Sequence, residues 1–215
     1  MDQRNGYCTR FAGAGIVIKD ERVARLINLI KAAFCPPAGV PRILLALSFG
    51  FVCHTIFAAA ILAMITAMFF GLSESFGTVP WPWAVLTNLI LIVQFPLAHS
   101  VLLSKRGGIL LRRLIPGPHG DTLATTTYAI IASAQLSALF AFWTPSGIVW
   151  WRAEGAAFWA LTTAYAASWL LLTKSSFDAG AEAQSGALGW MSLMARIRPV
   201  FPRMPTKGMF RLIRQ

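Results

Sequence analysis

Charged residues are scarce in this sequence: Asp, Glu, Lys and Arg make up 13% of its 215 residues, against roughly 25% in an ordinary soluble domain. Hydrophobic residues make up 56%. So little polar surface excludes both a soluble globular protein and an intrinsically disordered chain. The three cysteines are too few for a disulfide-rich scaffold, and their spacing does not suit a metal site. The composition therefore favours a membrane protein.

Long runs without any charge hold most of the apolar residues. A helix crosses about 30 Å of hydrocarbon with roughly 20 apolar residues, and four runs reach or approach that length. These charge-free runs are 43–73, 75–104, 122–151 and 155–173. The sequence therefore predicts an all-α fold, a multi-pass membrane bundle whose four transmembrane helices occupy residues 43–173.

Acidic residues are also few, with 8 against 19 basic residues. The segments before, between and after the four runs carry seven, zero, four, one and seven Lys or Arg residues. Because cytoplasmic loops collect Lys and Arg, we expect both termini and the loop 105–121 to face the cytoplasm of a bacterial inner membrane. This alternation indicates a lipid bilayer as the partner of the basic residues and argues against a nucleic acid.

The two cytoplasmic flanks, residues 1–42 and 174–215, have patterns of their own. Residues 20–34 place apolar side chains at helical spacing and the basic ones away from them, with Asp20 as a candidate N-cap. This predicts an amphipathic helix that lies on the membrane surface or docks onto a partner subunit. The tail is basic, and its uncharged stretch 183–195 is too short to span, which predicts a re-entrant or interfacial helix.

Polar side chains inside a span are costly and therefore mark candidate sites. His54 lies in the first run, Gln94 and His99 in the second and Tyr128 in the third, which predicts a polar seam near the cytoplasmic side. Such groups either bond across helices or supply a single ligand to a haem or pigment. At 1.5 Å per residue, His54 and His99 are expected to differ in depth by roughly 9 Å, so they do not share one iron. No metal site is expected.

Short motifs from residue 94 onward have the spacing of a known family. They are QFPLAHS at 94–100, Arg112 and Arg113 before Pro116, Thr127-Tyr128, and Trp143-Thr144-Pro145 followed by Trp150. Over roughly residues 84–214 the chain resembles membrane methyltransferases of the methanethiol S-methyltransferase and isoprenylcysteine carboxyl methyltransferase group. The resemblance implies S-adenosylmethionine as methyl donor and a small thiol or a prenyl or lipid acceptor. The site residues it implies are Gln94, His99, Tyr128, Arg112 and Arg113, with Arg211 and Arg214 close to the donor if the chain continues.

The donor-binding signature of that family, Arg-His-Pro-x-Tyr-x-Gly, does not occur in the 215 residues. We therefore expect a non-catalytic, methyltransferase-like accessory or structural subunit, packed against partner subunits in a larger respiratory or photosynthetic membrane complex. The alternative is a methyltransferase seen without its donor-binding part, which would use S-adenosylmethionine only if the chain continues. A third hypothesis is a pigment or haem carrier with His54 or His99 as its single ligand.

Overall fold

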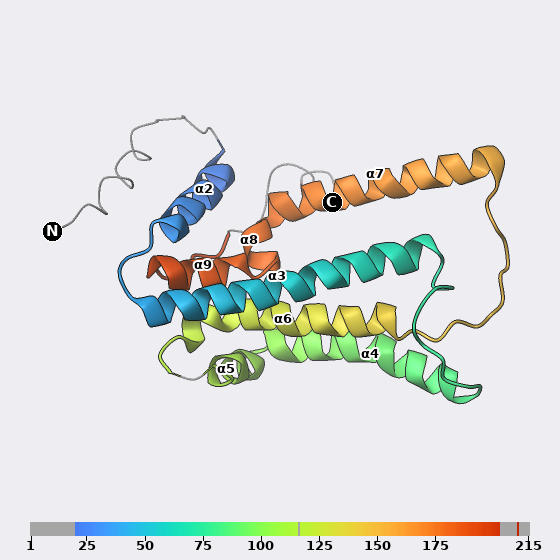
Figure 1. The fold of residues 1–215 in the computed structure, drawn as a ribbon, viewed down its shortest axis with the longest axis horizontal. Coiled ribbons are helices and arrows are strands. Elements are labelled where there is room, and N and C mark those ends of the chain that lie inside the picture. The colour runs from blue at the N-terminus through green and yellow to red at the C-terminus, as the bar shows by residue number, and fades with distance from the viewer. Residues whose placement is uncertain (1–19, 116, 203–209, 211–215) are drawn as a thin grey trace.

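The computed structural model describes residues 20–115, 117–202 and 210. These residues form helices joined by turns and loops, with no strand among them (Figure 1). Four of the helices are long and apolar enough to cross a membrane, which confirms the predicted all-α, multi-pass membrane bundle. The helices, in chain order, are α2 (Glu21–Phe34), α3 (Val40–Phe69), α4 (Trp83–Leu103), α5 (Lys105–Arg113), α6 (Gly120–Ala141), α7 (Gly155–Ala179), α8 (Ala181–Gln184) and α9 (Ala187–Ala195).

Helix α2 begins and ends where the sequence predicts. Asp20 is its N-cap, and Oδ1 of Asp20 accepts a hydrogen bond from the backbone N–H of Arg22 at 2.9 Å. This satisfies one of the donors that the first turn of a helix leaves without a partner. The helix ends at Cys35, directly before two prolines that cannot continue it. Its buried residues, Leu29 and Ala33, lie on the side that packs against α9.

Three of the spans lie side by side, with α6 between α3 and α4 (Figure 1). Helix α3 has 30 residues, which gives it a length of about 45 Å at 1.5 Å per residue. The hydrocarbon core of a bilayer is about 30 Å thick, so α3 is longer than a span requires. Figure 1 shows its first turns reaching past the end of α7, into the region where α2, α5 and α9 gather. We therefore expect this end of the bundle to lie at the level of the lipid headgroups.

Helix α7 stands apart from the other three spans (Figure 1), and none of its residues is buried. It contacts the last turns of α3, where the hydroxyl of Tyr165 donates to the carbonyl of Ile65 at 2.7 Å. The rings of Phe158 and Tyr165 also pack against Phe69. Because lipid tails are as apolar as these side chains, a span can remain surrounded by lipid without protein cover.

Helix α9 lies within the stretch 183–195 that the sequence marks as a short helix. It packs against α2, α3 and α6, and six of its nine residues are buried. Its last turn is held by Arg42 of α3, which donates to the carbonyls of Leu193 and Met194. A cation at this position also complements the negative end of the helix dipole. The packing makes α9 part of the helical core at this end of the bundle.

The segment 105–121, read from the sequence as a loop, contains the helix α5. Ser104 begins this helix and accepts a hydrogen bond on Oγ from the backbone N–H of Gly107 at 3.1 Å. Gly107 lies so close to the backbone of Leu102 that a Cβ atom would stand 2.5 Å from the Cα of Leu102, so the chain turns sharply out of α4. Two adjacent glycines are poor helix formers, which explains why the sequence indicates a loop here.

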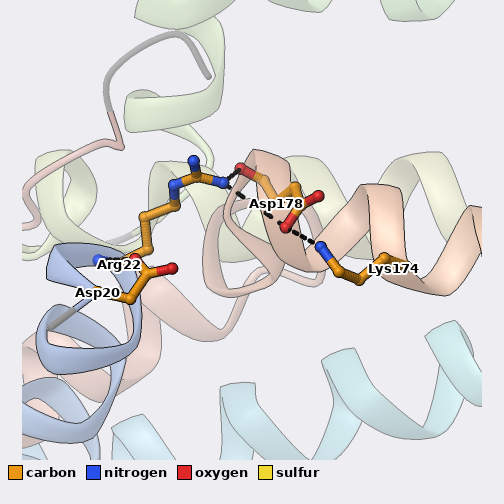
Figure 2. A network of polar contacts seen from close by, with 4 residues as sticks. All are labelled: Asp20, Arg22, Lys174 and Asp178. Carbon is orange, nitrogen blue, oxygen red and sulfur yellow. Dashed lines mark hydrogen bonds and ion pairs between the residues drawn. The ribbon is translucent and has the colours of Figure 1, made fainter. Parts of the chain in front are cut away.

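Polar contacts fasten α2 to the end of α7. Nη1 of Arg22 donates to the backbone carbonyl of Asp178 at 2.9 Å and lies 3.6 Å from Oδ1 of the same residue. Lys174 pairs with this carboxylate as well, and Figure 2 shows the three residues together. One turn along α2, Arg25 donates to Oε1 of Glu182 through Nε at 3.2 Å and Nη2 at 2.8 Å. Glu182 is 4% exposed, so α2 supplies the cation that this buried carboxylate needs.

Replacing Arg25 with alanine should lower the free energy of unfolding by about 2 kcal/mol, because the Glu182 carboxylate then stays buried without its cation. The loss is smaller than for a fully buried pair, since the side chain of Arg25 keeps 30% of its exposure. Thermal unfolding in a mild detergent measures the effect. Adding Glu182→Gln to Arg25→Ala should recover most of the loss, and no recovery would mean that the ion pair is not its cause.

Candidate functional site

Polar contacts join α4 to α6 at two levels and to the segment just after α6 at a third, and we call the residues that make them the polar seam. Asn88 exchanges two hydrogen bonds with the backbone of Thr144, receiving one from its N–H at 2.9 Å and donating one to its carbonyl at 2.8 Å. Gln94 and Gln135 each donate through the side-chain amide to the other's backbone carbonyl, at 3.0 and 3.3 Å. Hydrogen bonds of this kind hold spans together where lipid offers no polar partner. The seam comprises Asn88, Gln94, His99, Tyr128, Gln135 and Thr144.

The third level of the seam differs because both side chains can ionise. The hydroxyl of Tyr128 forms a hydrogen bond with Nδ1 of His99, in which it donates when Nδ1 carries no proton, and it lies 3.2 Å from Nε2. The ring of Phe95, one turn earlier in α4, lies 5.5 Å from the imidazole, measured between ring centroids. Both residues of the pair are partly exposed. A phenol that donates to an imidazole can accept a proton from a third group while its own proton moves to the ring.

The two arginines of α5 lie at the rim of the bundle. Arg112 pairs with Asp121 at 3.1 Å, with both side chains largely exposed, and an exposed pair of this kind contributes little to stability. Arg113 is exposed as well. The contacts of the described residues do not join either arginine to the seam. Arg211 and Arg214, which the resemblance places near the donor, lie outside the described residues.

His54 has a different partner from His99. The indole Nε1 of Trp190 donates to Nε2 of His54 at 3.0 Å, with the two rings edge to face. Gly50, one turn earlier in α3, leaves room for the indole, because a Cβ there would lie 2.8 Å from Cδ2 of Trp190. The described residues show no contact between the two histidines and contain no cluster of three or more potential metal ligands. A haem bound through Nε2 of His54 would have to displace the bond from Trp190.

Two of the cavities on the described part of the chain bear on ligand binding. The larger is a groove of about 740 Å³ on the face of α3 beside His54 and Trp190, and apart from His54 and Thr55 its other lining residues are apolar or glycine. The smaller cavity, about 190 Å³, is below the 300–1,000 Å³ that is roughly usual for ligand pockets. S-adenosylmethionine has a charged amino-acid end and a nucleoside, which need several polar partners. Neither of these two cavities therefore fits this donor.

No protein-family model and no solved structure matches the chain. Methanethiol S-methyltransferase of Pseudomonas deceptionensis is 31% identical to it over 100 residues. The match covers 45% of this chain and 36% of the relative, so the chain corresponds to about a third of that protein's length. The helices and this match together identify a multi-pass membrane protein that is distantly related to a membrane methyltransferase.

Proposed function

We propose that the chain forms part of a membrane methyltransferase that transfers a methyl group from S-adenosylmethionine to a small thiol, or to a prenyl or lipid acceptor. The observation that carries the proposal is the 31% identity to methanethiol S-methyltransferase over 100 residues. The comparison lends no support to the accessory subunit that the sequence alone led us to expect, and it favours the alternative. The distribution of basic residues supports a bacterial inner membrane with both termini in the cytoplasm.

The proposal assigns the acceptor side of the reaction to the described residues. When bound, S-adenosylmethionine supplies an electrophilic methyl group on a sulfonium. The two cavities do not fit this donor, and we propose that residues outside the described part of the chain bind it, with Arg211 and Arg214 near it. The described helices then have to hold the acceptor and, for a thiol, remove its proton.

The His99–Tyr128 pair is suited to the second task. A thiolate is a far better nucleophile than a thiol, so the S–H proton has to leave before or as the sulfur reacts. We assign the acceptance of this proton to Oη of Tyr128, whose own proton passes along the existing hydrogen bond to Nδ1 of His99. The pair then carries the proton as an imidazolium, and the sulfur keeps the electron pair it needs for attack. A carboxylate acceptor is already ionised at neutral pH and would not need this step.

The surroundings of the pair suit an acceptor that arrives from the membrane. Leu103, one turn after His99 on the same face of α4, is 63% exposed, and in a bilayer this surface faces lipid. His99 lies one turn before the end of α4 at Leu103, close to the headgroup level. A small apolar thiol dissolved in lipid, or a prenyl chain with a thiol or carboxyl end, can reach the pair from this side.

A methyl-transfer assay tests the proposal directly. Membranes that contain the full-length protein are incubated with methyl-labelled S-adenosylmethionine and either methanethiol or a prenylcysteine, and labelled dimethyl sulfide or methyl ester is measured. We expect transfer to one acceptor class well above that of membranes without the protein. If neither acceptor is methylated and the protein purifies with a larger membrane complex, the methyltransferase is wrong and the accessory subunit is right.

A further inference from the structure

The smaller cavity combines apolar walls with polar groups and lies at the end of the bundle where α2 and α9 pack. Its volume is about 190 Å³, and it is enclosed by α2, α8, α9 and the extended segment 197–200. Leu29, Leu188, Ile197 and Val200 form its apolar walls. The cavity is adjacent to Glu182, just beyond the last residue of α7. It therefore lies where the ends of the spans meet the lipid headgroups.

Ser192 points to a ligand in this cavity. The residue is fully buried, and its hydroxyl has no hydrogen-bond partner within the described structure. A buried hydroxyl without a partner costs about 1 to 3 kcal/mol, and Ser192 lines the cavity. An acceptor atom bound there would remove this cost.

The charges around the cavity favour an anion. Arg25, Asn28, Glu182 and Arg198 are its other polar residues. Arg25 already neutralises Glu182 through two hydrogen bonds, so this pair adds no net charge. The exposed Arg198 leaves the cavity with one positive charge in excess. An oxyanion can therefore receive hydrogen bonds from Arg198, Asn28 and Ser192 without leaving the Glu182 carboxylate uncompensated.

We propose that this cavity binds the phosphate of an anionic phospholipid from the adjoining leaflet. The donors hold the phosphate, while the glycerol and the first carbons of the acyl chains lie on Ile197 and Val200, which are 46% and 65% exposed. These apolar walls favour a lipid phosphate over free inorganic phosphate, which would gain nothing from them. The bound lipid would link α2 to α9 and to the segment that follows α9. This inference is independent of the methyltransferase proposal.

Thermal unfolding of the full-length protein in a neutral detergent, with phosphatidylglycerol, phosphatidylcholine or inorganic phosphate added, tests the inference. We expect phosphatidylglycerol to raise the unfolding midpoint at low mole fraction, and the other two additives to have little effect. Native mass spectrometry of the same samples should show one retained phosphatidylglycerol. Equal stabilisation by phosphatidylcholine, or by inorganic phosphate alone, would overturn the proposal.

Two variants and a matched control locate the lipid. Arg198→Ala should weaken phosphatidylglycerol binding about tenfold, which corresponds to the loss of one charge-assisted hydrogen bond. Ser192→Ala should weaken it less while stabilising the lipid-free protein, since it removes an unpartnered buried hydroxyl. Arg196→Ala is the control, because Arg196 is exposed and close in sequence but does not line the cavity. If Arg196→Ala weakens binding as much as Arg198→Ala, the attraction is a general surface charge and the site is wrong.

Discussion

Gly189→Val should leave little folded protein, because α9 can no longer dock against α6. A Cβ atom at Gly189 would stand 2.8 Å from the backbone carbonyl oxygen of Thr122 and still closer to Oγ1 of Thr126. Thr126 is fully buried, and its hydroxyl donates to the carbonyl of Gly186 at 2.7 Å and accepts from the N–H of Trp190 at 3.0 Å. Forcing α9 away costs about 1 to 3 kcal/mol for overpacking and about 1 to 3 kcal/mol for each buried group that loses its partner. The sum is comparable to the whole stability of many domains.

Yield of monodisperse protein and the thermal unfolding midpoint in detergent measure this loss. Gly108→Ala is the matched control, since Gly108 is also a helical glycine and a Cβ there would meet nothing within 4 Å. This control should be neutral or should stabilise α5 by up to about 1 kcal/mol. A Gly189→Val protein with the midpoint of Gly108→Ala would show that α9 does not depend on its contact with Thr126.

The spans and α2 could be predicted from the sequence because the signals that define them are local. Charge-free runs, the N-cap at Asp20 and the prolines after α2 all lie within the element they determine or next to it. The docking of α9 could not be predicted in the same way. Its hydrogen bonds reach Thr126, 60 and 64 positions away, and His54, 136 positions away. Nothing near Trp190 in the sequence indicates that its indole will lie over Gly50.

The candidate site, too, could be predicted from the sequence only in part. Gln94, His99 and Tyr128 stand out because polar side chains inside spans are costly, and the structure does place all three on the contact between α4 and α6. Which partner each one meets depends on how far the two helices are rotated about their axes, and packing along the whole of α6 sets this rotation. Gln135 also stands out as a polar residue inside the third run, but nothing in the sequence indicates that Gln94 is its partner. Arg112 and Arg113 matched a family pattern, yet they lie at the rim, because α5 turns away from α4 at Gly107.

The pair at the end of the seam carries the largest expected effect on activity. Tyr128→Phe removes the oxygen that we propose as the first proton acceptor, and His99→Ala removes the second. Each change should lower the rate of methyl transfer to a thiol by about 10² to 10⁴-fold, the usual contribution of a positioned acid or base. The double variant should be hardly worse than either single one, since the two side chains act as a unit. Tyr165→Phe is the control, because its hydroxyl joins α7 to α3 at Ile65, away from the seam, and this variant should keep full activity.

A purely structural role for His99 and Tyr128 would also lower activity, so the pH dependence has to separate the two roles. If the pair removes the thiol proton, raising the pH should shrink the deficit of both variants, because the thiol then ionises in solution and needs no acceptor. Where the unaltered protein also methylates a carboxylate acceptor, the same variants should do so almost as fast. If the substitutions only loosened the contact between α4 and α6, methyl transfer to both acceptors would be slower at every pH. A deficit that is constant with pH and equal for thiol and carboxylate would therefore reassign the pair to holding α4 against α6, as Asn88 and Gln94 do along the rest of the seam.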